Sequence, residues 1–138
     1  MAGYSGTPLP QKLGIKEGAR VALLHAPADF GATLGELPAG AVVTTRLGQA
    51  HDVIVAFVDT RRHLERAIAK LEQAIFPDGA IWIARPRKAT YGPDDISEHS
   101  VREVCLPRGL VDVKVCAIDD TWSGLKVVWR KERRTAGR

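Results

Sequence analysis

Apolar residues along the chain gather in short runs that alternate with amphipathic or polar segments. Three runs are almost wholly apolar, the pattern of strands buried on both faces of a parallel sheet: 20–26, 52–59 and 80–84. Residues 41–47 are short and β-branched, which predicts an outer strand. The strands predicted at 111–119 and 125–131 are joined by too few residues for a parallel crossover, so we expect an antiparallel hairpin.

The segment 61–76 has the period of an amphipathic helix. Leu64, Ile68 and Leu71 fall at positions i, i+4 and i+7 and belong to one apolar stripe. A stripe of this kind predicts a helix that packs one face against the sheet.

Two shorter helical segments complete the pattern, at 30–37 and at 96–106. Asp95 and Glu98 have the spacing of a capping box, which predicts where the second of these helices begins. The predicted order is therefore β-α-β-β-α-β-α-β-β. This order predicts a three-layer, Rossmann-like α/β fold, with a mostly parallel six-stranded sheet and an antiparallel strand from the C-terminal hairpin.

The chain length of 138 residues and the apolar content of 45% suit one domain with its own core. We place this domain at residues 20–131. Residues 1–19 are rich in glycine and proline, lack periodicity and are predicted to form an N-terminal arm. Residues 132–138 are predicted to form a disordered basic tail.

The net charge of +4 is concentrated at the C-terminus. The last nine residues carry five basic side chains and one acidic side chain, so the rest of the chain is neutral. A neutral body argues against a nucleic-acid-binding surface. The first residues lack the pattern of a signal peptide, and no apolar run reaches membrane-spanning length. We therefore expect a cytoplasmic protein with no membrane partner, and Cys105 and Cys116 are expected in the core.

This layout resembles a trimmed class I methyltransferase, the Rossmann-like fold that binds S-adenosylmethionine. Residues 16–26 match the first strand and its entry, and residues 52–86 match the central strand, the long helix, the Pro-x-Gly turn and the next strand. The opening residues 4–18 and the closing residues 110–130 also resemble a bacterial family known as a domain of unknown function. This resemblance runs nearly end to end, and it implies the fold without implying any chemistry.

The turn after the first strand departs from the methyltransferase pattern. There the chain needs glycines, because the amino-acid end of the cofactor approaches the backbone closely. Here His25, Pro27 and Asp29 occupy the three glycine positions. The second strand ends in residues 45–47 (TRL), without the acid that would hold the ribose. We predict a module that has lost the S-adenosylmethionine-binding loop, binds no cofactor and acts as a small-ligand or protein-interaction domain.

The alternative is a divergent S-adenosylmethionine-dependent methyltransferase, or another small enzyme that uses the crevice at the carboxyl ends of the strands. This crevice is expected between the first and third strands, where the strand order reverses. A basic rim there would bind a small anionic ligand, and an imidazole–carboxylate pair between His25 and Asp59 would serve as an acid/base couple. Solvated loop charges and a structural histidine are the other interpretations. The candidate ligand-binding residues are His25, Asp29, Asp59, Arg61, Arg85 and Lys88.

The turn 119–124 (DDTWSG) is a separate candidate for contact with a protein partner. Asp119 and Asp120 offer paired carboxylates, and Trp122 offers an aromatic platform. A purely structural hairpin turn is the other interpretation. Three strand spacings would place this turn ~14 Å from the crevice, too far to share a small ligand with it.

Other catalytic signatures are absent from the sequence, which has no Gly-x-Ser-x-Gly elbow, no P-loop and no His-Glu-x-x-His motif. His51, His63 and His99 lack the spacing of metal ligands, so we predict no metal site. His63 and His99 are expected to be exposed on helices. The sequence leaves the oligomeric state open.

Overall fold

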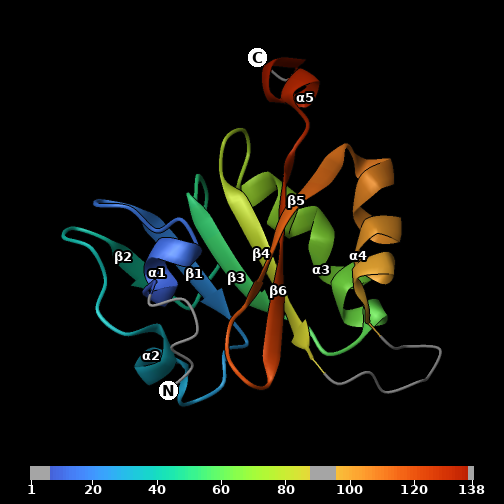
Figure 1. Cartoon of the computed structure of the whole chain (residues 1–138). Helices are drawn as coiled ribbons and strands as arrows, with labels where there is room; N and C mark the ends of the chain where they lie inside the picture. The colour runs from blue at the N-terminus through green and yellow to red at the C-terminus, as the bar shows by residue number, and fades with distance from the viewer. Residues whose placement is uncertain (1–6, 88–95, 137–138) are drawn as a thin grey trace.

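The structure is a computed structural model that describes residues 7–87 and 96–136, and six strands within these residues form one mixed sheet (Figure 1). The strand order is β2-β1-β3-β4-β6-β5, in which the first four strands are parallel and β6 is antiparallel to both of its neighbours. The strands are β1 (Arg20–Leu24), β2 (Val42–Thr44), β3 (Val53–Phe57), β4 (Ala80–Pro86), β5 (Leu110–Ala117) and β6 (Trp122–Trp129). This arrangement confirms the predicted α/β fold class.

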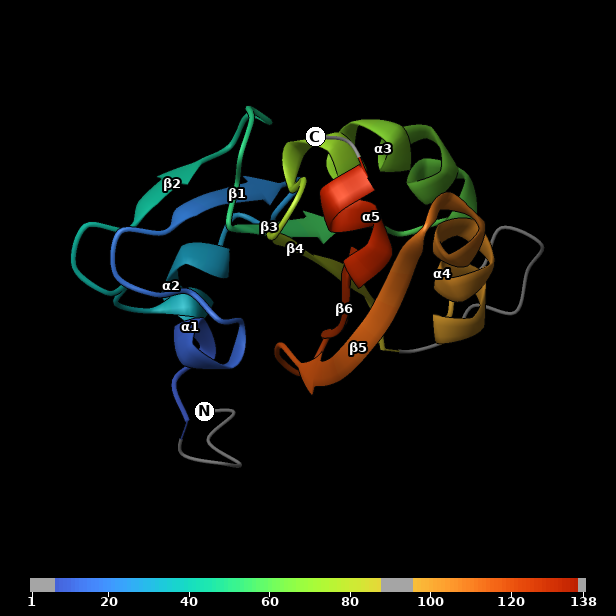
Figure 2. The same ribbon diagram turned by 90° about the horizontal axis from the view of Figure 1, so that it is seen from above.

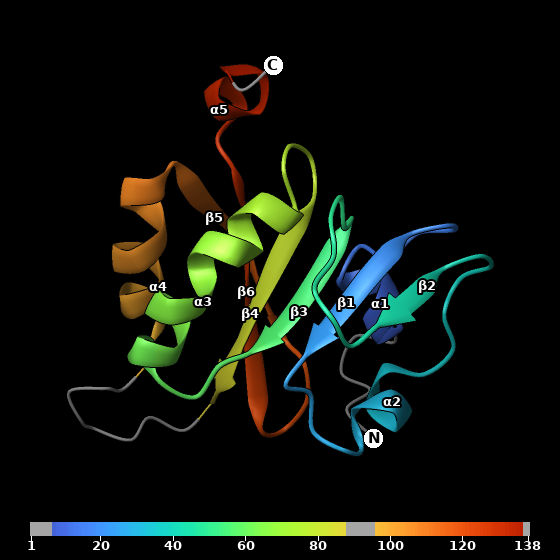
Figure 3. The same cartoon turned by 180° about the vertical axis from the view of Figure 1, so that it is seen from behind.

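Helices cover both faces of this sheet. The longer helices α3 and α4 lie on one face, and the short helices α1 and α2 lie on the other, beside β1 (Figures 2 and 3). The helical segments are α1 (Leu9–Lys12), α2 (Phe30–Leu34), α3 (Arg61–Ala74), α4 (Glu98–Cys105), the single 3₁₀ turn η1 (Leu106–Arg108) and α5 (Lys131–Ala136). No described helix is both long enough and apolar enough to cross a lipid bilayer.

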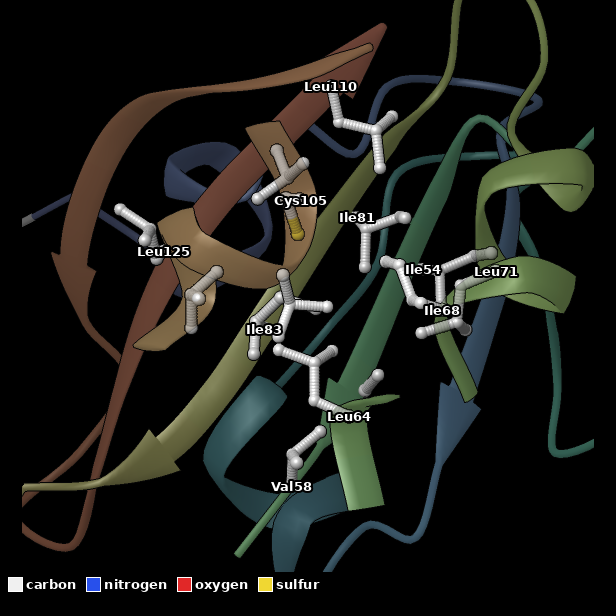
Figure 4. Close-up of a cluster of buried hydrophobic side chains, with 14 of the residues drawn as sticks. Ile54, Val58, Leu64, Ile68, Leu71, Ile81, Ile83, Cys105, Leu110 and Leu125 are labelled. Carbon is white, nitrogen blue, oxygen red and sulfur yellow. The ribbon is translucent and has the colours of Figure 1, made fainter. Parts of the chain in front are cut away.

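The α3 stripe packs against the middle of the sheet, as the sequence period predicts. Leu64, Ile68 and Leu71 are at most 2% exposed and face isoleucines of β3 and β4 (Figure 4). Full burial of each such side chain contributes roughly 1.5–3 kcal/mol. Cys105 lies in the same cluster, and its burial raises the pKa of its thiol to about 12. This cysteine is a core residue, as predicted, whereas Cys116 is half-buried.

Residues 13–19 pack into the domain, in contrast to the predicted arm at residues 1–19. Leu13 and Ile15 are 0% and 3% exposed and belong to the core on the α1 side of the sheet. The indole nitrogen of Trp82 donates a hydrogen bond of 2.9 Å to the backbone oxygen of Leu13. A buried indole N–H needs such a partner, so this bond ties α1 to the centre of the sheet.

Helix α4 begins at a different cap from the one that the sequence predicts. The N-cap is Ser97, whose hydroxyl accepts the backbone N–H of Ser100, while the Ser100 hydroxyl accepts the backbone N–H of Ser97. The predicted cap, Asp95, lies outside the described residues, and Glu98 is the first helical residue. The two serines form the same kind of reciprocal capping box as the predicted Asp/Glu pair, two residues later in the chain.

Part of the predicted disordered tail is helical. Residues 131–136 form α5, which follows β6 and extends beyond the end of the sheet (Figure 1). The Arg134 side chain donates a hydrogen bond of 3.0 Å to the backbone oxygen of Trp129. The Arg133 side chain lies against Gly109, where an added Cβ would come within 2.9 Å of it. These contacts hold the start of the predicted tail against the domain.

Candidate functional site

The carboxyl ends of β1 and β3 border a small hollow at the point where the strand order reverses. Strand β1 pairs with β2 on one side and with β3 on the other, which is the arrangement that opens a crevice in α/β sheets. The hollow has a volume of about 220 Å³. Its lining residues are His25, Phe57, Asp59, His63 and Trp122. The predicted crevice therefore exists, and it contains two of the predicted ligand-binding residues, His25 and Asp59.

His25 follows the last residue of β1 and has an unusual backbone conformation. Its φ is +57°, in the left-handed region that favours glycine. This is the first of the three glycine positions in the methyltransferase pattern, so the turn keeps a glycine-like conformation without the glycine. A left-handed non-glycine residue costs on the order of 1–3 kcal/mol and is typical of functional sites. The His25 side chain is exposed at the mouth of the hollow.

The partner of Asp59 is His63, in place of the predicted His25. The distance from Asp59 Oδ1 to His63 Nδ1 is 3.6 Å. Thr60 caps α3 and accepts the backbone N–H of His63 at 3.0 Å, so the first turn of the helix brings residues 59 and 63 together. The His63 ring in turn meets the His25 ring edge-on, with 4.9 Å between the centroids. The side chain of His63 is 26% exposed, so the prediction that it is exposed is wrong.

Aromatic side chains form the opposite wall of the hollow. Phe57 contacts Phe30 edge-on at 4.9 Å and Trp122 edge-on at 5.0 Å between ring centroids. Trp122 begins β6, opposite Pro86 of β4. The predicted separation of the 119–124 turn from the crevice is therefore wrong, because β6 lies directly beside β4 and brings Trp122 back to the hollow.

The two acidic residues of that turn do not line the hollow. Asp119 Oδ1 accepts the backbone N–H groups of Thr121 and Trp122, each at 2.8 Å. This pattern is an Asx turn, so Asp119 has the structural role that was the alternative interpretation. Asp120 is exposed beside it. The structure therefore joins Trp122 to the crevice and leaves the two carboxylates outside it.

The predicted basic rim is largely neutralised by carboxylates. Arg61 binds Glu103 at 2.6 Å and Glu65 at 3.2 Å, and Arg85 lies 3.5 Å from Glu98. The hydrogen bond to Arg61 lowers the pKa of the Glu103 carboxyl and raises that of the guanidinium. Neither arginine lines the hollow.

The remaining predicted site residues lie elsewhere. Asp29 is the exposed N-cap residue of α2 and is also absent from the lining. Lys88 lies outside the described residues. Among residues 7–87 and 96–136, no group of three His, Cys, Asp or Glu side chains is placed to hold a metal ion.

Sequence reasoning missed His63 as a site residue. Its spacing of four from Asp59, at the start of a clear helix, was a signal that points to this pair. Phe57 was also missed, since it reads as one more apolar residue of a buried strand. No local signal distinguishes it from its neighbours.

The fold of the chain is similar to that of several solved methyltransferase structures. The chain superposes on a putative type 11 methyltransferase from Sulfolobus solfataricus with a TM-score of 0.62 and 14% identity, covering 89% of this chain and 90% of the other. A SAM-dependent methyltransferase from Aquifex aeolicus gives a TM-score of 0.59 at 14% identity, covering 85% of each chain. The chain has a methyltransferase-like fold. Identities this low show the fold alone.

Sequence comparison adds one partial relative. The chain is 34% identical over 104 residues to porphobilinogen deaminase from Shouchella clausii (strain KSM-K16). The match covers 67% of this chain and 32% of the deaminase, so the chain spans about a third of that protein's length. No family model matches the sequence, and the resemblance to the bacterial family of unknown function stays a prediction.

Proposed function

We propose that the chain is a cytoplasmic, methyltransferase-like module that has lost the usual S-adenosylmethionine-binding loop and binds a small ligand, or a side chain of a partner protein, in the hollow. The observation that carries this proposal is the hollow itself, because His25 occupies the glycine position at its mouth and its volume is about 220 Å³. Pockets that enclose drug-sized ligands measure roughly 300–1,000 Å³. The hollow is smaller than such pockets, which supports a ligand more compact than S-adenosylmethionine.

The lining supports a compact ligand with one flat apolar side and one polar side. Phe57 and Trp122 offer ring faces and edges, and the imidazoles of His25 and His63 offer hydrogen bonds. Because Arg61 and Arg85 are paired with carboxylates, a negatively charged group of the ligand would meet the imidazoles rather than the guanidinium groups.

A second candidate function is a small enzyme at the same site, including a divergent methyltransferase. The Asp59–His63 pair favours it, since a carboxylate that orients an imidazole is a common general-base arrangement. The deaminase activity of the sequence relative is not part of this proposal, because the match spans 32% of that protein.

Calorimetry separates the two candidates. The full chain should give no heat of binding with S-adenosylmethionine or S-adenosylhomocysteine, and no thermal shift with either. A thermal-shift screen of small anions, nucleotides and heteroaromatic acids should then find a stabilising compound whose effect is lost in His63→Ala.

The matched control is His99→Ala, because the His99 side chain is 80% exposed and lies outside the hollow. This variant should keep the full effect of the compound. A thermal shift with S-adenosylmethionine that disappears in Asp29→Ala or His25→Ala would instead establish the divergent methyltransferase.

A further inference from the structure

A second surface of the molecule lies on the α1 side of the sheet, over β5 and β6. In Figure 2, α1 and α2 lie on this side near β1, and none of the described helices lies on this side of β5. Lys126 of β6 pairs with Trp82 of β4, whose side chain points to α1, so Lys126 also faces this side. The cross-strand neighbours on the same face are Gly124, Val128, Val111, Lys114 and Cys116.

Lysines converge on this face from three elements. Lys114 of β5 lies directly opposite Lys126 of β6. Burial raises the pKa of the Cys116 thiol, and the positive charges of Lys12, in the last turn of α1, and of Lys114 oppose this, so both lysines lie within electrostatic range of Cys116. Lys16 and Lys126 line an adjoining hollow of about 420 Å³. We call the surface formed by Lys12, Lys16, Lys114 and Lys126 the lysine face.

The charges of the lysine face lack partners within the described part of the chain. Every ion pair among the described residues involves arginine or histidine, and none involves these four lysines. Like charges directly opposite each other on antiparallel strands destabilise a sheet. The Lys114–Lys126 pair therefore carries a cost that an anionic group bound between the two ammonium groups would remove.

The residues around the lysines indicate which kind of anion this surface would bind. Val111, Val128 and Cys116 are half-buried between the lysines and offer apolar contact. Three carboxylates, those of Glu17, Asp52 and Asp78, line the adjoining hollow together with Lys16 and Lys126. These carboxylates would repel a continuous phosphate backbone, whereas a peptide can present acidic groups to the lysines and apolar groups to the valines.

We propose that the lysine face binds an acidic segment of a partner protein, with carboxylates on Lys12, Lys114 and Lys126 and apolar side chains over Val128. This interaction is independent of the small hollow at the carboxyl ends of β1 and β3. The acidic segment would cover the part of β5 and β6 that no described helix covers on this side of the sheet.

Fluorescence anisotropy tests the proposal with a labelled peptide that alternates glutamate and leucine. The full chain should bind this peptide, and the affinity should fall as salt is raised. The double variant Lys114→Gln/Lys126→Gln should bind roughly five- to tenfold more weakly. The control double variant Lys70→Gln/Lys131→Gln loses the same charge from exposed positions on α3 and α5, and it should bind as the wild type does.

Three results would overturn the proposal. The first is a wild-type chain that does not bind the peptide, and the second is an equal loss of affinity in the control variant. The third concerns a labelled single-stranded DNA of the same charge: if Lys114→Gln/Lys126→Gln weakens DNA binding as much as peptide binding, the surface recognises charge alone.

Discussion

His51 is 3% exposed and lies just before β3. Its Nε2 accepts the backbone N–H of Gly48 at 2.9 Å, so the proton of the neutral ring sits on Nδ1. Nδ1 is buried and has no hydrogen-bond partner in the described structure. Burial, followed by the nearby positive charge of Arg20, lowers the pKa of His51, while the Arg20 backbone and then the Asp52 carboxylate oppose this. The folded protein therefore favours the neutral form of this histidine.

This preference predicts how stability changes with pH. Because the folded-state pKa lies below the unfolded value of about 6.5, the unfolded chain binds a proton more readily. The His51 contribution to the free energy of unfolding is therefore present above about pH 6.5 and is lost as the pH falls toward the folded-state pKa. In urea titrations at pH 8 and pH 5, His51→Gln should lose less stability than the wild type. The exposed His99→Gln should behave as the wild type, and an equal loss in all three proteins would refute the prediction.

At the scale of elements, the short helix α1 matters more than its length suggests. It brings Leu13 to complete burial against Trp82, which lies at the centre of the sheet. The connection is non-local, since 69 residues separate the hydrogen-bonded partners. The segment therefore acts as the third layer of the fold on this side, together with α2.

Truncation of Leu13 tests this role. Leu13→Ala should destabilise the protein by about 2–5 kcal/mol, because it leaves a cavity in a packed core. The measurement is the free energy of unfolding from urea denaturation monitored by circular dichroism. Leu106→Ala is the control, because this leucine is 38% exposed, and it should cost less than about 1 kcal/mol. A cost for Leu13→Ala as small as that of the control would mean that α1 is a dispensable arm.

At the scale of the whole molecule, the excess positive charge lies at the C-terminus, and the rest of the chain has no net charge. The last nine residues hold the entire net charge of +4, and α5, which carries much of it, extends beyond the sheet. The body binds its own arginines to its own carboxylates, as Arg61 and Arg102 illustrate. Any non-specific attraction for nucleic acid should therefore reside in the C-terminal residues.

Deletion of residues 131–138 tests this separation of charge. The full chain should bind DNA weakly at low salt, with an affinity that falls steeply as salt increases. The truncated chain should show no measurable binding in the same anisotropy titration. Its melting temperature should stay close to that of the full chain, because none of the described side chains at 131–134 belongs to either core cluster. Unchanged DNA binding after the deletion would place the nucleic-acid contact on the folded body.

Local periodicity in the sequence was enough to predict most of the elements and their order. The continuous apolar runs predict β1, β3 and β4, because a strand buried on both faces has apolar residues at every position. The stripe through Leu64 and Ile68 predicts α3, because a helix buried on one face has apolar residues every three or four positions. The short linker between β5 and β6 requires an antiparallel pair. The location of the crevice followed from the same order, since it lies between β1 and β3, where the strand order reverses.

Contacts between distant segments depended on the three-dimensional arrangement and had no local signal. Trp122 reaches the hollow because β6 inserts between β4 and β5, and linear order would have placed it at the sheet edge. Leu13 is buried by residues far along the chain, although its own segment has no periodicity. Gly79 is required because an added Cβ would lie 2.2 Å from the backbone oxygen of His51. A side chain's own segment specifies its secondary structure, whereas its neighbours in space depend on how the whole sheet is assembled.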